Sequence, residues 1–597
     1  MRNKNYGRIG ATAAPEFGGR YADILSVHNF YQLIPPEEYF ATHPEWFSEV
    51  GGQRTTSSAQ LCLTNKEMRD EVFSRIRDIP KTHPGISAIW IGQNDWNGYC
   101  ECANCRAVID REASPSGPLI EFVNDMAERI AAIDPNVSIS TFAYEWSQKP
   151  PAHLKPRENV NIWLATTGCS YVHLYTDPIN RVFQERLESW SKICNRIFIW
   201  DYITNFSAYL SPYPNLRTLA PNIRNFAEHH VAGIWSQGAY SAPGSELGEL
   251  RAWVLLKLMW DPSRDAESLI DEFLDGYYGK AGRPIREYLN VFHNAMEQSG
   301  KTMYMTDQPF LGKHLTLKTV LEGYELMRTA ESAVLDDPVL HQRVKVAQLP
   351  ILYVMLLNWD ELKDQARRNG ERWPLTNDMK PVYERFVAMC EENGVTQKSE
   401  SNARDFWPWI EERTKMTVDV PPPADCRDLP RDRWVQLQDL GFNLKPPHAE
   451  KGVSDPLASD GFAARMGTDH DVPAIQKQLY RIPLVVKAAA DGRKIRCKIA
   501  VRVEFAGKSR QGAALKCDFE SSAGIFGMRE VRVDELKGSG YQTIDLGEQS
   551  GHGFMDVTAH RAGSPFRGKG DLGGPDLAHP FRGIMKTDLT EEKSGLY

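Results

Sequence analysis

The chain has 597 residues, 42% of them hydrophobic and 25% charged, which is enough to bury a large core and to form two or three domains. Its formal net charge of −8 provides no basic surplus, which disfavours nucleic acid and anionic membrane surfaces as partners, and we expect no nucleic-acid partner. No apolar run reaches the roughly 18 residues that a membrane-spanning helix needs. These values do not determine an oligomeric state.

Short apolar runs that alternate with helical patterns occupy the first half of the chain. The clearest helix begins near Ser116, and its apolar residues recur at helical spacing until shortly before Pro135. We predict further helices at 66–78, 178–195, 215–230 and 247–260, and strands at 25–30, 60–64, 86–93, 137–144, 159–165, 196–203 and 231–237. Apolar strands that alternate with amphipathic helices are typical of a parallel sheet. We therefore predict an α/β fold with a (β/α)8 TIM-like barrel over residues 1–264.

The second half of the chain changes its periodicity twice. Helical spacing predicts a helical domain over 265–419, which ends near the proline-rich run at 420–424. Strict alternation of apolar and polar residues at 495–505 then predicts an antiparallel strand, and this strand belongs to a predicted C-terminal β-sandwich over 428–563. Its neighbouring strands are predicted at 480–489, 513–520, 526–534, 541–547 and 554–561. The last segment, 564–597, is rich in glycine, proline and mixed charge and is predicted to be a disordered tail.

Three carboxylates follow the predicted strands of the barrel: Asp95, Glu145 and Asp201. Reactive groups of parallel barrels come from the carboxyl ends of the strands and from the loops after them. Glycoside cleavage needs one protonated carboxyl group for the leaving oxygen and a second group to stabilise, attack or activate water. We therefore predict these three residues to be catalytic. A carboxylate at a strand end also commonly caps the next helix or loop, and this alternative stays open for each of them.

Amide, imidazole and aromatic side chains occupy the same strand ends. Amides can bond sugar hydroxyl or acetamido groups, and aromatic rings stack on the C–H faces of sugars. The predicted substrate-binding residues are His28, Gln93, Asn94, Trp96, Tyr144, His173, Tyr202, Asn205, Gln237 and Tyr240. The chain lacks a G-x-S-x-G elbow, an H-E-x-x-H pair and a Walker loop, which argues against serine hydrolysis, zincin chemistry and P-loop phosphoryl transfer.

Three cysteines follow Asp95 in the spacing C-x-C-x-x-C: Cys100, Cys102 and Cys105, with Cys62 as a candidate fourth. A tight loop can present several thiolates to one structural zinc ion. The spacing differs from the usual two C-x-x-C pairs, so a disulfide and free thiols stay open as alternatives. Apart from this candidate zinc, we expect no cofactor.

Several motifs occur in a specific order over about residues 2–300. They include H-N-F-Y-Q-L-I-P-P-E-E-Y-F at 28–40, Q-L-C-L-T-N at 60–65, N-D-W-N-G-Y-C-E-C-A-N-C at 94–105 and W-D-Y-I-T-N-F-S-A-Y-L at 200–210. Together they resemble the family catalogued as domain of unknown function 4838, some of whose members are glycoside hydrolase family 163 endo-β-N-acetylglucosaminidases. The resemblance implies a TIM-barrel glycosidase, preceded by a small α/β domain like that of α-glucuronidases and followed by helical and β modules.

The family's members are usually exported. The segment R-N-K-N-Y-G at 2–7 is similar to the part that follows the family's first barrel strand, and only seven strands are recognisable here. We therefore expect either an irregular strand or a truncation that removed the first strand, the preceding domain and the signal peptide. The resemblance then implies an extracytoplasmic location.

Two positions depart from the family pattern, in which a Glu often stands where this chain has Ser236 or Gly168. If either Glu is the proton donor, its loss should lower acid catalysis by about 10²–10⁴-fold.

The leading hypothesis is a hydrolase of β-linked, N-acetylated glycans. In it Asp95 orients or stabilises the reacting sugar, Glu145 or Asp201 is the acid, and the substrate acetamido group can act as the nucleophile. One alternative is a catalytically degenerate glycan-binding protein on the same barrel, and another is a metal-dependent hydrolase that uses the cysteine loop.

Overall fold

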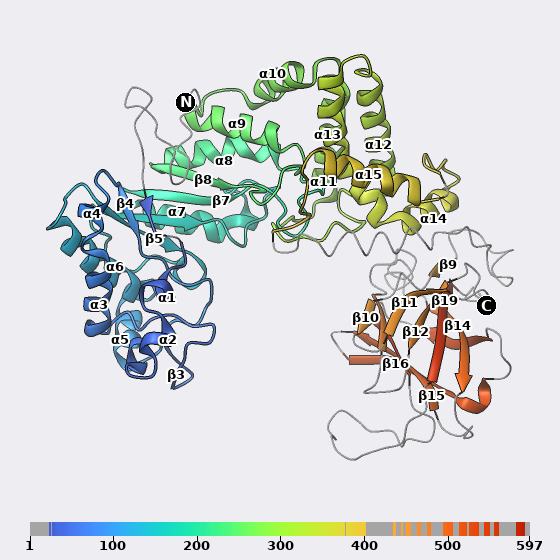
Figure 1. Ribbon diagram of the computed structural model, residues 1–597, viewed down its shortest axis with the longest axis horizontal. Helices are drawn as coiled ribbons and strands as arrows, with labels where there is room; N and C mark the ends of the chain where they lie inside the picture. Colours follow the sequence, from blue (N-terminus) through green and yellow to red (C-terminus); the bar gives the residue numbers. More distant parts are fainter. Residues whose placement is uncertain are drawn as a thin grey trace. The chain divides into compact units, whose positions relative to one another are not determined.

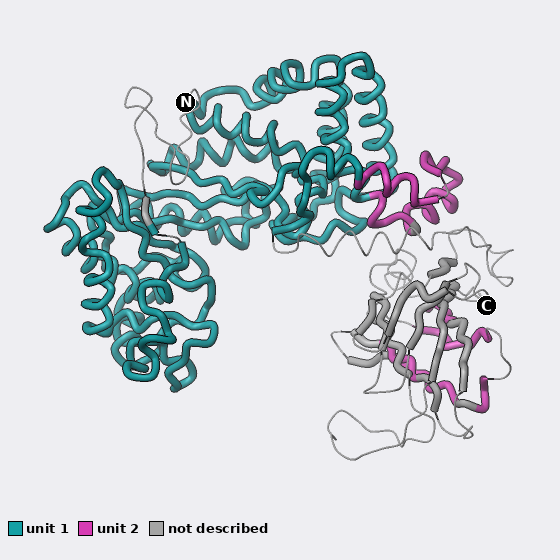
Figure 2. Tube along the Cα trace, in the orientation of Figure 1, with its two compact units in different colours: residues 1–354, 388–403 teal, residues 355–387, 404–597 magenta. Residues whose placement is uncertain are grey.

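The computed structural model describes residues 23–25, 27–376 and 378–400, together with short segments between 434 and 591. The chain divides into two compact units (Figure 2). The first comprises Met1–Val354 and Ala388–Ala403, and the second comprises Met355–Val387 and Arg404–Tyr597. None of the described helices is long and apolar enough to cross a membrane.

A parallel sheet is the centre of the first unit (Figure 1). Its six strands lie in the order β1-β4-β5-β6-β7-β8, and every neighbouring pair is parallel. The bounds are β1 Asp23–Ile24, β4 Ala88–Trp90, β5 Ser138–Ala143, β6 Val160–Ala165, β7 Ile197–Tyr202 and β8 Gly233–Gln237. Strands that follow one another in sequence and in space are typical of a barrel wall, and the described strands form a half-barrel in which β8 does not pair with β1. Closure into eight strands stays a prediction.

The two faces of this sheet differ, because successive side chains of a strand point to opposite sides. On one face Ile139, Ile162 and Ile199 join a large apolar core with the helices. On the other face Trp90 and Trp163 pack with further aromatic rings. The helices that contribute to this core are α3 Lys66–Ile76, α6 Ser116–Ala131, α7 Arg181–Ser191 and α8 Leu216–Glu228. This part of the chain also contains α5 Ala103–Glu112 and α9 Gly248–Trp260.

Two of the predicted strands are wrong. The segment 60–64 forms only isolated bridges, Phe47 with Leu61 and Ala59 with Gly98, and belongs to an insertion between β1 and β4. That insertion contains α1 Phe30–Leu33, α2 Pro36–Tyr39, β2 Glu49–Val50, β3 Gln53–Arg54, α3 and α4 Ile79–Thr82. The second wrong strand is the one predicted at 25–30. The observed strand β1 ends before it, at Ile24, because Leu25 and His28 have φ values of 70° and 56°, which an extended strand cannot contain.

The helical region predicted from 265 contains helices throughout its described part. They are α10 Ala266–Tyr278, α11 Gly282–Ser299, α12 Leu317–Ser332, α13 Pro338–Leu357, α14 Trp359–Asn369 and α15 Lys380–Glu392. The division of the chain at 264, 419 and 563 stays a prediction.

Antiparallel strands make up the described part of the C-terminal region. One sheet has the order β10-β13-β18-β15-β16 and the other β11-β12-β19-β14-β17, with β9 paired to β19. The bounds are β9 Trp434–Leu437, β10 Asn443–Lys445, β11 Ala449–Ser454, β12 Phe462–Met466, β13 Ala474–Gln478, β14 Ile495–Phe505, β15 Ala513–Ser521, β16 Gly524–Arg532, β17 Gln542–Gln549, β18 Phe554–Ala559 and β19 Phe581–Glu591. The strand predicted at 495–505 is confirmed, the one at 480–489 lies outside the described residues, and the sandwich stays a prediction.

Strand β19 lies inside the segment that the composition predicts to be a disordered tail. It pairs with β14 along its whole length, from Phe505 opposite Phe581 to Ile495 opposite Glu591. The prediction is therefore wrong for 581–591, where a distant partner strand outweighs the local composition, and the rest of the tail lies outside the described residues.

Candidate functional site

The carboxyl ends of β4 and β5 are joined by a direct hydrogen bond. The hydroxyl of Tyr144 donates to the Oδ1 atom of Asp95 at 2.7 Å. His28, from the loop after β1, stacks on Phe142 with ring centroids 5.0 Å apart and lies 5.8 Å from the Tyr144 ring. The sheet thus brings His28, Asp95 and Tyr144 together, as the sequence predicts for neighbouring strand ends.

Tyr202 is the last residue of β7, and the negative charges of several carboxylates act on its phenol. Burial raises the pKa of its phenol, and the negative charges of Asp95, Glu400 and Glu145 raise it further, in that order, followed by that of Asp201. Ionising this phenol would place another negative charge beside these groups. Tyr202 therefore stays a neutral hydrogen-bond donor in an acidic site.

Glu145 has an unusual backbone conformation. Its φ of 51° lies in the left-handed region, which costs a residue with a side chain about 1–3 kcal/mol. The adjoining turn holds it there, since the backbone N–H of Tyr144 donates to the Ser147 Oγ atom and that of Ser147 donates to the Tyr144 carbonyl, both at 3.1 Å. Its side chain is exposed and has no hydrogen-bond partner among the described residues. Strain of this kind is concentrated at functional sites.

Glu400 is a member of the site that the sequence did not reveal. Its Oε1 atom accepts hydrogen bonds from the Tyr240 hydroxyl at 3.0 Å and from Gln237 Nε2 at 3.2 Å. Its backbone N–H donates to the carbonyl of Phe206 at 2.9 Å. Glu400 thus adds a carboxylate to the end of β8, although it follows α15 in the chain and belongs to no motif.

Two aromatic rings at this edge of the sheet face solvent. Trp96 is 44% exposed and contacts the ring of Tyr31 at 5.8 Å, and Tyr240 is 68% exposed. Large exposed rings beside carboxylates offer the apolar surface on which a sugar ring can stack.

Gln93 and Asn94 are buried, and their side-chain amides are used inside the protein. Gln93 Nε2 donates to the carbonyl of Tyr144 at 3.0 Å, and Gln93 Oε1 accepts from the hydroxyl of Ser147. Asn94 Nδ2 donates to the carbonyl of Ala59 at 3.0 Å. Both amides therefore position the loops that carry Asp95 and Glu145.

Asp201 lies on the other side of the sheet. Along β7 it alternates with Tyr202, so it faces the helices with Ile197 and Ile199. It is 6% exposed and accepts hydrogen bonds from the hydroxyls of Thr166, at 2.9 Å, and Tyr175. Burial raises its pKa to about 6, although these hydrogen bonds act in the opposite direction.

Asn205 and His173 are also engaged within the protein. Asn205 Nδ2 donates to the carbonyl of Asp307 at 2.6 Å, and His173 Nδ1 lies 2.8 Å from the hydroxyl oxygen of Ser170. Neither residue contacts Asp95, Glu145 or Glu400 through any hydrogen bond of the described chain.

The two positions that depart from the family pattern lie in different surroundings. Ser236 is directly opposite Asp201 in the sheet, and its hydroxyl is buried without a hydrogen-bond partner among the described residues. Paired residues of neighbouring strands point to the same face, so Ser236 faces the helices rather than Tyr202. Gly168 has a φ of 80°, and a Cβ there would meet no atom within 4 Å.

The cysteines predicted as metal ligands form a separate, buried cluster behind the loop of Asp95. Cys62 joins Cys100, Cys102 and Cys105, and none of the four forms a disulfide. The cluster contributes no side chain to the acidic site.

Fold and site define an α/β protein whose parallel sheet carries an acidic and aromatic site at its carboxyl edge. Residues 2–290 match the family described as Domain of unknown function (DUF4838). The family resemblance seen in the motifs is thus confirmed. No curated protein matches the chain.

Three of the solved structures to which the chain is similar have low TM-scores. A GH138 enzyme targeting pectin rhamnogalacturonan II has a TM-score of 0.31 and 10% identity, with 93% of this chain and 85% of that chain covered. CpGH89 from Clostridium perfringens, in complex with its substrate GlcNAc-alpha-1,4-galactose, has a TM-score of 0.37 and 12% identity, with 68% and 47% covered. A carbohydrate esterase from the Shiga toxin-encoding bacteriophage phi24B has a TM-score of 0.18 and 9% identity, with 26% and 91% covered. TM-scores this low do not define the activity of this chain.

Proposed function

We propose that this protein is a glycoside hydrolase that acts on β-linked, N-acetylated glycans on a (β/α)8-type barrel. The observation that carries the proposal is the pair of carboxylates held at the carboxyl edge of the sheet: the Tyr144 hydroxyl donates to Asp95, and Tyr240 and Gln237 donate to Glu400. Glycoside cleavage needs carboxyl groups on both sides of the scissile bond. The motifs shared with the DUF4838 family support the same assignment.

Asp95 and Glu145 take different roles in this proposal. The hydrogen bond from Tyr144 fixes the direction of the Asp95 carboxylate, which suits a group that stabilises the reacting sugar or polarises a substrate acetamido group. Glu145 is exposed and unpartnered, so its carboxyl group is free to approach a leaving oxygen, and we assign it the role of acid. Asp201 is buried on the helix side and is better explained as part of the core.

The remaining groups would bind the glycan. Trp96 and Tyr240 provide exposed rings for stacking, and Glu400 can accept hydrogen bonds from sugar hydroxyls. The neutral Tyr202 phenol would donate a hydrogen bond to the sugar or to a carboxylate.

Hydrolysis can be tested by incubating the purified chain with a panel of glycans that contain β-linked N-acetylglucosamine and measuring reducing-end release by mass spectrometry. Glu145→Gln keeps the shape of the side chain but cannot donate a carboxyl proton, so release should fall by about 10²–10⁴-fold. Glu322→Gln, an exposed carboxylate on α12, is the matched control and should leave release unchanged. Full activity of Glu145→Gln would remove it from the acid role.

A catalytically degenerate glycan-binding protein is the second candidate. It is motivated by Gly168 and Ser236, which have no carboxyl group where the family often has a Glu, although Ser236 faces the helices. Calorimetric binding of the same glycans without any release during long incubation would establish the binding protein and overturn the hydrolase. A panel that is neither bound nor cleaved would overturn both.

A further inference from the structure

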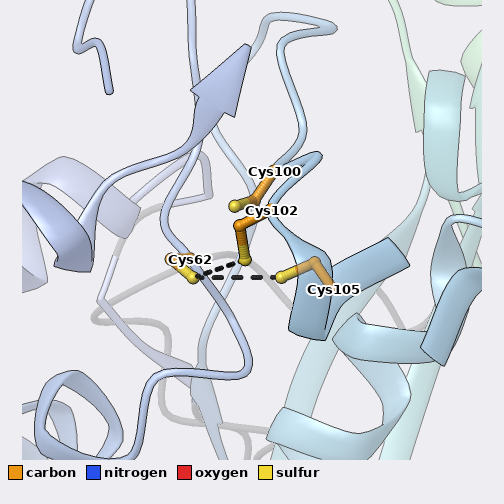
Figure 3. Close-up of side chains that lie close together, drawn as sticks. All are labelled: Cys62, Cys100, Cys102 and Cys105. Carbon is orange, nitrogen blue, oxygen red and sulfur yellow. Dashed lines mark hydrogen bonds between the residues drawn. The ribbon is translucent and has the colours of Figure 1, made fainter. Parts of the chain in front are cut away.

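The sulfur atoms of four buried cysteines form one close cluster (Figure 3). The exposed fractions of Cys62, Cys100, Cys102 and Cys105 are between 1% and 7%, and their sulfurs all lie within 4.8 Å of one another. The Cys62 sulfur is 3.6 Å from that of Cys102 and 3.9 Å from that of Cys105. Four sulfurs about 2.3 Å from a central zinc ion are about 3.8 Å apart, whereas a disulfide needs about 2.05 Å.

The ligands come from two segments that are distant in the sequence. Cys62 lies in the insertion between β1 and β4, while Cys100 and Cys102 lie in the loop after β4. Cys102 is the N-cap residue of α5 and Cys105 lies in the first turn of that helix. The positive end of a helix dipole stabilises thiolates, which are the form that binds metal.

Hydrogen-bond donors surround the sulfurs. The backbone N–H of Glu49 donates to the Cys100 sulfur at 3.3 Å, and the Thr64 hydroxyl lies 3.1 Å from the Cys105 sulfur. The Arg54 guanidinium lies 3.6 Å from the Cys100 sulfur and also pairs with the Glu49 carboxylate at 3.5 Å. A zinc ion with four thiolates carries two net negative charges, and donors and a cation in the outer shell compensate such charge. Neutral thiols would not require them.

We propose that Cys62, Cys100, Cys102 and Cys105 bind one structural zinc ion as four thiolate ligands, and that this ion anchors the loop that carries Asp95. No ligand position is left for water or substrate, so the site is closed and does not take part in catalysis. This assignment stands independently of the proposed function.

The anchoring follows from the connections of the loop. Cys100 is five residues after Asp95, and Cys62 is two residues after Gln60. The Gln60 Nε2 atom donates to the carbonyls of Asn94 and Trp96, on either side of Asp95. A zinc ion that joins Cys62 to Cys100 therefore closes a second link between the same two segments.

The metal can be measured directly on the full chain. Protein produced with zinc in the medium should contain about one zinc per chain by elemental mass spectrometry. X-ray absorption at the zinc edge should show four sulfurs at about 2.3 Å. These two measurements use the unaltered protein and do not depend on whether a variant folds. Absence of stoichiometric zinc, a different bound metal, or oxygen and nitrogen ligands would overturn the proposal.

Variants assign the ligands. Cys62→Ser and Cys105→Ser should each lose zinc, measured as at least a tenfold lower zinc content after dialysis against a chelator. Cys194→Ser is the matched control, because Cys194 is also a buried free thiol but lies outside the cluster. Zinc retained in Cys62→Ser, or lost equally in Cys194→Ser, would contradict the ligand set. A disulfide between any two of the four cysteines in peptide mapping of the native protein would also contradict it.

Discussion

The Tyr144 hydroxyl and the Asp95 carboxylate form a 2.7 Å hydrogen bond that links the loops after β5 and β4. Strands β4 and β5 are direct neighbours in the parallel sheet, with Trp90 opposite Ser140, and both loops leave from the same edge. The bond therefore fixes the carboxylate at the place where parallel barrels carry their chemistry.

Tyr144→Phe should remove this bond while keeping the ring that contacts His28. A hydrogen bond to a charged group contributes about 1.5–3 kcal/mol, and partial exposure places this one at the lower limit. Under the proposed function, kcat should fall about tenfold with a smaller change in KM, measured on the released glycan. Tyr304→Phe is the control, since Tyr304 lies outside the site and should leave kcat unchanged. An unaltered kcat in Tyr144→Phe would show that the bond does not support turnover.

Glu145→Gly tests the backbone strain at this residue without reference to any activity. Glycine adopts positive φ without penalty, which relieves about 1–2 kcal/mol, but it also makes the unfolded chain more flexible, which costs about 0.4–1 kcal/mol. The free energy of unfolding in urea should therefore stay level or rise by about 1 kcal/mol. Glu158→Gly, at an exposed loop residue without positive φ, should lower it by about 0.4–1 kcal/mol. Equal losses in both variants would show that Glu145 is not strained.

Much of the parallel sheet could be predicted from the sequence. Strands β5, β6, β7 and β8 are short apolar runs between helical patterns in the sequence, and their predicted bounds differ from the observed ones by no more than two residues. The face on which Asp201 lies could also be predicted, because Asp201 continues the alternation of Ile197 and Ile199, which point toward the helices. The prediction of Asp201 as a catalytic residue considered its position at the strand end and not its face.

Other features depend on tertiary contacts that no local pattern shows. The segment 60–64 has strand-like apolar residues, but its backbone bonds to irregular neighbouring segments: Gln60 N–H donates to the Gly98 carbonyl, and Leu61 forms only an isolated bridge with Phe47. Glu400 reaches Tyr240 across 160 residues of sequence. Cys62 is only a candidate fourth ligand in the sequence, because it lies far before the C-x-C-x-x-C loop, and its distance from Cys102 required the fold.

The raised pKa of Asp201 predicts a pH-dependent stability. A buried carboxyl group with a pKa of about 6 binds its proton more tightly in the folded chain than in the unfolded chain, where the pKa is about 3.8. The stability that this tighter proton binding contributes is fully present below pH 3.8 and is lost as the pH rises through 6. The total loss in the free energy of unfolding is on the order of 3 kcal/mol. Asp201→Asn, which stays neutral, should be of similar stability at pH 4 and more stable than the original chain at pH 7.

Urea unfolding at several pH values between 4 and 8 measures this difference. Asp336→Asn provides the comparison, because Asp336 is exposed and forms only a surface ion pair with Lys280. Asp336→Asn should change the free energy of unfolding by less than about 1 kcal/mol, and this change should be the same at every pH above 5. A difference between Asp201→Asn and the original chain that does not grow with pH would show that Asp201 is ionised without cost.

Gln60 makes the loop of Asp95 dependent on the insertion before β4. Its Oε1 atom accepts the backbone N–H of Asn94 at 2.8 Å, and its Nε2 atom donates to the carbonyls of Asn94 and Trp96. Gln60→Leu keeps the volume but leaves these buried backbone groups without partners, at about 1–3 kcal/mol for each group that water cannot reach. In Gln60→Leu, hydrogen exchange of the Asn94 backbone amide should therefore become at least tenfold faster, while hydrogen exchange of the β6 amides should be unchanged. If the proposed zinc ion supports the same loop, Cys62→Ser should also accelerate hydrogen exchange of the Asn94 amide. The variant that combines Gln60→Leu with Cys62→Ser should then exchange faster than either single variant. Unchanged exchange at Asn94 in Gln60→Leu would mean that the loop is held by its own turn and by neither link.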